Sequence, residues 1–269
     1  MSKPGGPMAA AATWDSVAES YTQHVMPLFE NYAREALRHS GVAPASEILD
    51  VAAGPGTLAL MAAELGHTVT AIDFSRGMID RLRSASNARK LRLDTKVCDA
   101  QALELPGDKF HAAFSMFGFM FLPSRARGFA ELFRVLRPGG KAVVATWAPL
   151  EKLPFMSAVF GSLAELVPGS PAPVKVLDSS ETCITEMAMA GFSDVHVEHA
   201  TFAFESPSLA EYWAWFPLSC APLAALSKTL GADYAPMMQK LYARVEERLG
   251  AGAIKVEMPA LLTVGTKGA

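Results

Sequence analysis

The chain has 269 residues and a net charge of −3, and 19% of its residues are charged, below the roughly 25% of an average soluble domain. This length allows one large domain, or a domain with an elaborated cap. The slightly acidic balance, without a basic run, argues against nucleic acid as a partner. The most apolar window starts at Phe110 and is shorter than the roughly 20 residues of a membrane-spanning helix.

The cysteines and the N-terminus indicate a cytoplasmic protein. Cys98, Cys183 and Cys220 form no CxxC pair and have no metal-ligand spacing, which is typical of reduced thiols. Residues 1–12 are rich in glycine, proline and alanine and do not resemble a signal peptide, so we expect a disordered tail. We therefore expect no metal site and no membrane span.

The first half of the chain predicts alternating strands and helices. Two helical stretches precede Gly41, the first carrying Trp14 and Tyr21 and the second starting near Pro27. Strands are predicted at 47–52, 68–73, 94–98, 111–116 and 141–147, and helices at about 57–65, 76–84 and 124–136. Such βα units predict an α/β fold, a parallel sheet with helices on both faces.

The pattern changes after Trp147. Prolines are expected to break residues 148–175 into short pieces, and strand character returns at 191–204 and at the C-terminus. Residues 208–250 form a helical insert that opens with aromatic residues. We expect one domain from residue 13 to 269. Its core is expected at about 41–150, 191–204 and 258–267, and its cap at 13–40, 148–190 and 205–257.

The stretch ILDVAAGPGTLAL, residues 48–60, places small residues at the tip of a buried strand, where a ligand can approach the backbone closely. Gly54 to Ala59 fits GxGxxA, so a dinucleotide fingerprint, a nucleoside site and a plain tight turn all remain open. Asp73 ends the next strand, 17 residues past Gly56, where its carboxylate could accept both ribose hydroxyls of an adenosine.

Two further acids favour a nucleoside with a cationic end. Asp50 lies inside the first strand, where a carboxylate is costly without partners, and Asp99 ends the third strand. Three carboxylates at the carboxyl ends of successive strands would line one crevice. They would repel a pyrophosphate and accept the ammonium group, ribose and adenine of S-adenosylmethionine (SAM).

Four stretches, ILDVAAGPGTLAL, VTAIDFSRGMID, VCDAQALELPGDKFHAAFSMFGFMFLP and VLRPGGKAVVATWAPLEKLPF, resemble the successive motifs of class I SAM-dependent methyltransferases. The similarity is greatest to the small-molecule branch related to the ubiquinone and menaquinone biosynthesis methyltransferases. It covers residues 14–150 well and 191–267 more loosely. It implies a Rossmann-like seven-stranded, mostly parallel sheet with a reversed last strand, helices on both faces and a helical cap.

The resemblance also implies a set of cofactor-binding residues. Asp50 and the Ala52–Gly56 backbone would hold the methionine end of SAM, Asp73 the ribose, and Asp99 the adenine edge. The full set is Tyr21, Asp50, Ala52, Ala53, Gly54, Gly56, Thr57, Asp73, Phe74, Met78, Asp99, Ala100, Gln101, Met116 and Phe117.

Two positions depart from the family pattern. A glycine is usual where Ala52 stands, and alanine fits there if its φ stays negative. An aspartate is frequent where His111 stands, so the resemblance assigns no role to this histidine; packing or capping at a strand end is the simpler interpretation.

Methyl transfer needs no metal, and an oxygen nucleophile would use a general base, usually histidine. His24 is the catalytic candidate because it lies one helical turn from Tyr21, although a surface histidine is the plainer alternative. Trp147 and Trp213 are the candidates for substrate contact. We expect the N-terminal helix, the segment after Trp147 and the aromatic insert to form one mobile cap.

The sequence thus predicts a SAM-dependent methyltransferase that acts on a small, largely apolar metabolite through oxygen, carbon or nitrogen. An NAD-linked oxidoreductase and a SAM-binding protein without transferase activity are the alternatives. The oligomeric state does not follow from the sequence.

Overall fold

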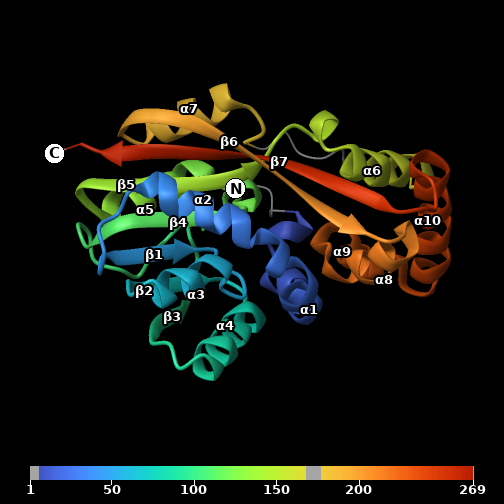
Figure 1. The fold of residues 1–269 in the computed structure, drawn as a ribbon, viewed down its shortest axis with the longest axis horizontal. Helices are drawn as coiled ribbons and strands as arrows, with labels where there is room; N and C mark the ends of the chain where they lie inside the picture. Colours follow the sequence, from blue (N-terminus) through green and yellow to red (C-terminus); the bar gives the residue numbers. More distant parts are fainter. Residues whose placement is uncertain (1–5, 168–176, 269) are drawn as a thin grey trace.

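A seven-stranded sheet runs through the computed structural model, which describes residues 6–167 and 177–268 (Figure 1). The strand order is β3-β2-β1-β4-β5-β7-β6. The first five strands pair in parallel, and β7 runs antiparallel to both β5 and β6. The strands are β1 (Glu47–Val51), β2 (Thr68–Asp73), β3 (Leu93–Val97), β4 (Phe110–Met116), β5 (Leu136–Trp147), β6 (Phe192–Ser206) and β7 (Ile254–Lys267). The seven-stranded sheet with a reversed last strand is confirmed.

The helices fall into two groups, those that cover the sheet and those gathered at one end of it. In chain order they are α1 (Ala11–Ser20), α2 (Glu30–Ser40), α3 (Thr57–Glu64), α4 (Arg76–Ala88), α5 (Arg125–Val135), α6 (Pro154–Leu166), α7 (Ser180–Met189), α8 (Leu209–Ser219), α9 (Ala221–Leu230) and α10 (Tyr234–Leu249). No helix among the described residues is long and apolar enough to cross a membrane.

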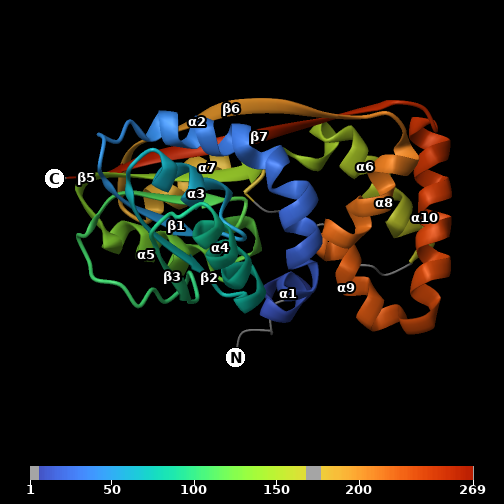
Figure 2. The same cartoon turned by 60° about the horizontal axis from the view of Figure 1, so that its bottom comes forward.

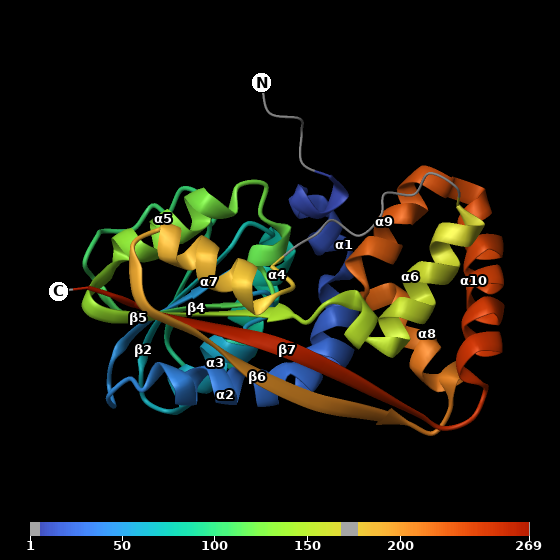
Figure 3. The ribbon, with the colours of Figure 1, turned by 90° about the horizontal axis from the view of Figure 1, so that it is seen from above.

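The two faces of the sheet have separate cores because successive strand residues point to opposite sides. Ile48 packs on the face covered by α2, α3 and α4, while Leu49 packs on the face covered by α5 and α7. Figure 3 shows α5 and α7 on one side of the sheet and α2 and α3 on the other. Both faces of this parallel sheet are therefore buried, and the carboxyl ends of its strands form the edge where a ligand can reach it.

The cap is built on the two longest strands. β6 and β7 extend past the other strands and pair as far as Ser206 and Ile254, and helices α8, α9 and α10 lie between these two residues in sequence. These helices and α6 gather at that end of the molecule (Figures 1 and 2). Cap residues such as Phe216 and Leu241 belong to the same hydrophobic cluster as the sheet, so body and cap share a continuous core.

The structure corrects four boundaries that the sequence suggested. The segment after Trp147 contains a 13-residue helix, α6, because Pro154 stands in its first turn, where a missing N–H costs nothing; residues 168–176 lie outside the described residues. Helix α2 buries Tyr32 and Leu37 against the sheet, and α7 buries Met187 there, so neither belongs to the cap.

The N-terminus is the fourth correction. Residues 7–9 form a 3₁₀ turn and α1 begins at Ala11, in place of a disordered tail over residues 6–12. The Thr13 hydroxyl donates to the Pro7 carbonyl at 2.8 Å and the Trp14 indole N–H to the Met8 carbonyl at 3.0 Å, which holds the turn against α1. Residues 1–5 lie outside the described residues.

Candidate functional site

The glycine turn after β1 places backbone N–H groups at the carboxyl edge of the sheet. Gly54 and Gly56 have φ of +55° and +96°, and Gly56 precedes α3. A Cβ at Gly56 would lie 2.2 Å from Leu82, so only glycine fits this position. Thr57 then begins α3, as expected for a strand–turn–helix unit that approaches a ligand with its backbone.

Ala52 adopts a left-handed conformation with φ of +55°, so the condition of a negative φ is not met and the alanine fits in another way. Its backbone is held because the next residue, Ala53, donates to the Ile72 carbonyl of β2 at 2.9 Å. Gly118 leaves room for the Ala52 methyl group, since a Cβ on Gly118 would lie 2.4 Å from the Cβ of Ala52. Strain at a non-glycine residue is thus retained at the turn.

Asp50 points a carboxylate into the interior beneath this turn. It is 1% exposed, and its Oδ2 accepts from the Ala59 N–H in the first turn of α3 at 3.1 Å. Its other oxygen, Oδ1, is buried and bonds to none of the described residues. Burial raises the pKa of Asp50 to about 8, although the Ala59 bond lowers it, and the Asp73 charge adds to the rise. Oδ1 is therefore an acceptor that a cationic or N–H-bearing ligand could satisfy.

Asp73, at the end of β2, is the second buried carboxylate of the site. Its two oxygens accept from the Gly54 N–H at 2.9 Å and the Ser75 N–H at 2.8 Å, which ties the glycine turn to the start of α4. Burial raises its pKa to about 6; those hydrogen bonds oppose the rise and the nearby Asp15 charge adds to it. Two buried carboxylates thus lie at neighbouring strand ends, as predicted.

The third predicted acid differs from the first two because it is exposed. Asp99 follows β3, accepts from the Gln101 N–H at 2.8 Å and also contacts the Gln101 side-chain amide. The side-chain oxygen Oε1 of Gln101 in turn accepts from the backbone N–H of Ser124 at 2.8 Å. Ala100 is buried beside them. This loop lies next to Asp73, whose carbonyl accepts from the Cys98 N–H at 3.0 Å.

The N-terminal segment closes over this edge. Tyr21 begins a π-helical turn, Tyr21–Val25, that follows α1, and π turns are frequent at functional sites. Tyr21 packs in one cluster with Met78, the predicted adenine neighbour. Burial and the Asp73 charge raise the pKa of the Tyr21 phenol, so it stays neutral. Tyr21 therefore lies near Met78 and Asp73, two of the residues that the sequence predicts for the cofactor site.

Aromatic rings form the adjoining wall, at the ends of β4 and β5. Phe117 has φ of +61° and stacks on Trp147 with ring centroids 3.9 Å apart. Phe29, from the turn before α2, contacts both rings at 5.0 and 5.4 Å. Met116, Phe29 and Trp147 are half-buried. The pairing of Phe117 with Trp147 brings together a cofactor candidate and a substrate candidate; Phe74, half-buried, follows Asp73 on the other side of the edge.

The catalytic candidate His24 lies against the cap. Its ring stacks on Trp215 of α8, with centroids 5.3 Å apart and planes 12° apart. Trp213, the predicted substrate contact on the same helix, packs instead on Phe216 and on Tyr242 of α10. The tryptophan of α8 that contacts the N-terminal segment is thus Trp215. Because α8 is apolar around its circumference, periodicity could not select which ring faces the site.

His111 has a structural role at the opposite edge of the sheet. Its Nδ1 accepts from the Glu47 N–H at 3.0 Å where β1 begins, and its Nε2 lies 2.8 Å from the Arg137 guanidinium. The amino ends of the strands lie there, away from the glycine turn. Packing and capping thus account for this histidine, as the sequence indicated.

Sequence reasoning missed Asp15 and Ser75. Asp15 accepts from the Ser75 hydroxyl at 2.6 Å and the Gly77 N–H at 2.8 Å, across 60 residues of sequence. Ser75 caps α4 by accepting from Met78 at 3.1 Å, a role that its position before RGM could have shown. Nothing local marks Asp15, since its partners come from another helix.

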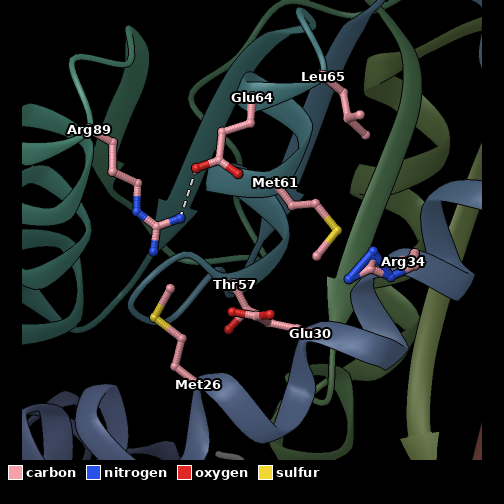
Figure 4. Close-up of a pocket in the computed structure, with 8 residues that line it drawn as sticks. All are labelled: Met26, Glu30, Arg34, Thr57, Met61, Glu64, Leu65 and Arg89. Carbon is pink, nitrogen blue, oxygen red and sulfur yellow. Dashed lines mark hydrogen bonds and ion pairs between the residues drawn. The ribbon is translucent and has the colours of Figure 1, made fainter.

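A pocket of about 270 Å³ opens between α2 and α3, beside the start of α3 (Figure 4). Glu64 and Arg89 form an ion pair of 2.9 Å at its rim. Of the predicted site residues only Thr57 lines it, so this pocket lies outside the carboxylate edge. The lining residues are Met26, Glu30, Arg34, Thr57, Met61, Glu64, Leu65 and Arg89. Within the described ranges no group of three or more His, Cys, Asp or Glu side chains could hold a metal ion.

Comparison with known proteins identifies the family. A profile of the methyltransferase domain family matches residues 48–140. The chain is 31% identical over 221 residues to a demethylmenaquinone methyltransferase of Clavibacter sepedonicus, covering 74% of this chain and 87% of that protein. It is 37% identical over 108 residues to an uncharacterised protein of Mycobacterium bovis, of whose length it spans only 39%.

Solved structures share the fold at low identity. A Haemonchus contortus phosphoethanolamine N-methyltransferase, solved with phosphomonomethylethanolamine and S-adenosylhomocysteine, superposes with a TM-score of 0.57 at 18% identity, over 89% of this chain and 53% of that one. The [4+2]-cyclase SpnF superposes with a TM-score of 0.57 at 21% identity, over 89% of this chain and 82% of that one. The fold alone therefore does not fix the reaction. The sequence match over most of the Clavibacter protein does fix the family, and the chain belongs to the class I SAM-dependent methyltransferases.

Proposed function

We propose that this protein transfers a methyl group from SAM to a small, largely apolar molecule. The observation that carries the proposal is the Oδ1 of buried Asp50, which bonds to none of the described residues and lies near enough to Asp73 for the Asp73 charge to raise the pKa of Asp50. Two buried carboxylates at the glycine turn complement a cationic ligand, because an opposite charge favours their ionised forms. The pyrophosphate of a dinucleotide would instead be repelled.

The residues at this edge fit the parts of SAM. Asp50 and the N–H groups of the turn would hold the amino-acid end, and Asp73 would accept the ribose hydroxyls in charge-assisted hydrogen bonds. Phe74 and Met78 would flank the adenine. Asp99, with the backbone of Ala100 and Gln101, would bind the adenine edge. The Haemonchus enzyme solved with S-adenosylhomocysteine supports this choice of cofactor.

SAM, when bound, supplies an electrophilic methyl group on a sulfonium. The aromatic wall of Phe29, Phe117 and Trp147 would exclude water and position an apolar acceptor, and positioning alone can supply much of a rate enhancement. For an oxygen acceptor, His24 would take up the proton. The name of the Clavibacter relative supports an apolar, ring-containing acceptor. We also propose a cytoplasmic location, since Cys98, Cys183 and Cys220 are free thiols.

Calorimetry with S-adenosylhomocysteine and with NADH tests the cofactor. We expect binding of the first and none of the second. Binding of NADH alone would overturn the assignment. Incubation with SAM and a panel of quinols, phenols and amines, followed by mass spectrometry, then tests the transfer. A protein that binds S-adenosylhomocysteine but methylates no member of the panel would favour the alternative of a binding protein without transferase activity.

A further inference from the structure

Helix α1 lies between the cofactor edge and the cap. Figure 2 shows it between α4 on one side and α8 and α9 on the other, and it contacts all three helices. Because Tyr21 follows directly from α1, the position of this helix decides whether the N-terminal segment covers the cofactor residues. The contacts on each side of α1 show how that position is set.

On the α4 side, the hydrogen-bonded contact is made by the carboxylate of Asp15. The Oδ1 of Asp15 accepts from the Ser75 hydroxyl at 2.6 Å and the Gly77 N–H at 2.8 Å. The Ser75 N–H donates to Asp73 at 2.8 Å, so a chain of hydrogen bonds joins α1 to the predicted ribose-binding carboxylate. The helices approach closely here, because a Cβ on Gly77 would lie 3.0 Å from Asp15 Oδ1 and 3.2 Å from its Cα.

On the cap side, three contacts join the N-terminal segment to α8 and α9. The hydroxyls of Ser20 and buried Ser219 lie 2.6 Å apart. Val17 packs in the cluster that contains Ala221 of α9. Just beyond α1, His24 stacks on Trp215, with centroids 5.3 Å apart. A movement of α1 away from α4 would therefore disturb the position of α8.

We propose that Asp15 is a positioning residue that fixes α1 on α4 and so couples occupation of the cofactor site to the closure of the cap. This inference rests on the proposed function. A ligand that engages Asp73 and Tyr21 stabilises the closed position of α1, and α1 in turn holds α8 in place. The cofactor then binds first, and the acceptor meets a cap that is already closed.

A second contact between the same helices provides a matched control. Glu19 of α1 and Arg81 of α4 form an ion pair of 3.4 Å with side chains 68% and 45% exposed. Solvent-exposed pairs of this kind contribute little to stability. Asp15, in contrast, accepts two short hydrogen bonds, one of them from a side chain that caps α4.

The first test compares Asp15→Ala, Asp15→Asn and Glu19→Ala by stopped-flow measurement of S-adenosylhomocysteine release. We expect Asp15→Ala to release it on the order of tenfold to a hundredfold faster, because hydrogen bonds to a charged group are lost. Asn keeps the accepting oxygen, so Asp15→Asn should restore most of the slow release. Glu19→Ala should match the wild type. Equal release from Asp15→Ala and wild type would overturn the proposal.

The second test is hydrogen exchange at residues 209–219, with the ligand at saturating concentration in each variant. When the ligand is added, wild type and Glu19→Ala should gain protection from exchange in α8. Asp15→Ala should gain protection at the glycine turn and no protection in α8. Protection of α8 in saturated Asp15→Ala would show that the coupling does not run through Asp15. A wild type that binds no S-adenosylhomocysteine would instead refute the proposed function, so the two failures are distinguishable.

Discussion

The cofactor edge and the aromatic wall next to it are built on different principles. At the cofactor edge, directional hydrogen bonds to Asp50 and Asp73 hold a backbone turn, and one acceptor has no partner in the part of the chain that the structure describes. At the wall, the rings of Phe29, Phe117 and Trp147 fill space with few directional bonds. The difference indicates that the first region recognises a fixed ligand by charge, while the second selects by shape and can vary.

The largest effect should come from Asp73→Ala. Its two ribose bonds would contribute about 1.5–3 kcal/mol each, so S-adenosylhomocysteine should bind on the order of a hundredfold more weakly, or worse. Asp99→Ala, at the exposed carboxylate, is the matched control and should cost less. Calorimetry measures both. Because Asp73 also holds Gly54, Asp73→Asn and a thermal melt separate lost binding from lost folding. Undiminished binding in both Asp73 variants would place the ligand elsewhere.

Asp50→Asn should lower the affinity for S-adenosylhomocysteine and stabilise the ligand-free protein at alkaline pH. The pKa of Asp50 lies near 8, above its ordinary value of 3.8, so the folded state binds its proton more tightly than the unfolded state. Stability from this group is present at low pH and is lost as the pH rises towards 8; Asp73, with a pKa near 6, acts in the same direction.

Denaturant titrations between pH 5 and 9 should therefore show a smaller pH-dependent loss of stability in Asp50→Asn than in wild type, with a difference on the order of a few kcal/mol at the alkaline end. An unchanged pH dependence would show that Asp50 is already ionised in the empty protein.

Trp147→Ala and Trp213→Ala compare a tryptophan of the aromatic wall with a tryptophan packed inside the cap. Trp147 is half-buried in the wall, so its loss should raise the acceptor KM and leave the affinity for S-adenosylhomocysteine unchanged. Trp213 packs on Tyr242 inside the cap, so its loss should lower the Tm and leave KM unchanged. Thermal melts and steady-state kinetics with an acceptor identified by the panel measure these effects. A KM effect from Trp213→Ala alone would reverse the two assignments.

The smallest effect should come from Ala52→Gly, which relieves a left-handed φ and should stabilise the chain by about 0.5–1 kcal/mol. Gly118→Ala is the opposing control. Its new methyl would lie 2.4 Å from that of Ala52 and should destabilise the chain. In the double variant part of that cost should disappear. Chemical denaturation of the four proteins gives the coupling energy, and strict additivity would show that the two methyl groups do not meet.

Much of the fold could be predicted because its signals are local. The second strand, 68–73, has the predicted bounds, and the strand–turn–helix unit around Gly54 and Gly56 carries its own punctuation. Asp50 and Asp73 followed from the same reasoning, since parallel strands bring their carboxyl ends to one edge.

The remainder depends on contacts between distant segments. The bonds of Asp15 to Ser75 and Gly77 arise only when α1 packs on α4. The choice of Trp215 over Trp213 depends on how α8 rotates against its neighbours, which an evenly apolar helix does not encode. The left-handed conformation of Ala52 places its methyl group against Gly118, 66 positions later, where a side chain would collide with that methyl.

The pairing of β6 with β7 has a consequence for descent within the family. The chain leaves the sheet at Ser206 and re-enters it at Ile254, which pairs with Ser206. The 47 residues between them therefore form one insertion whose two ends are held side by side by the sheet. Insertions, deletions or wholesale replacement there leave the register of β7 on β5 untouched, because that register is set from Trp147 and Ala260 onward. Loop closure also becomes only slowly more costly with length. A lineage can thus exchange the helices of the cap and inherit the edge that carries Asp50 and Asp73 intact.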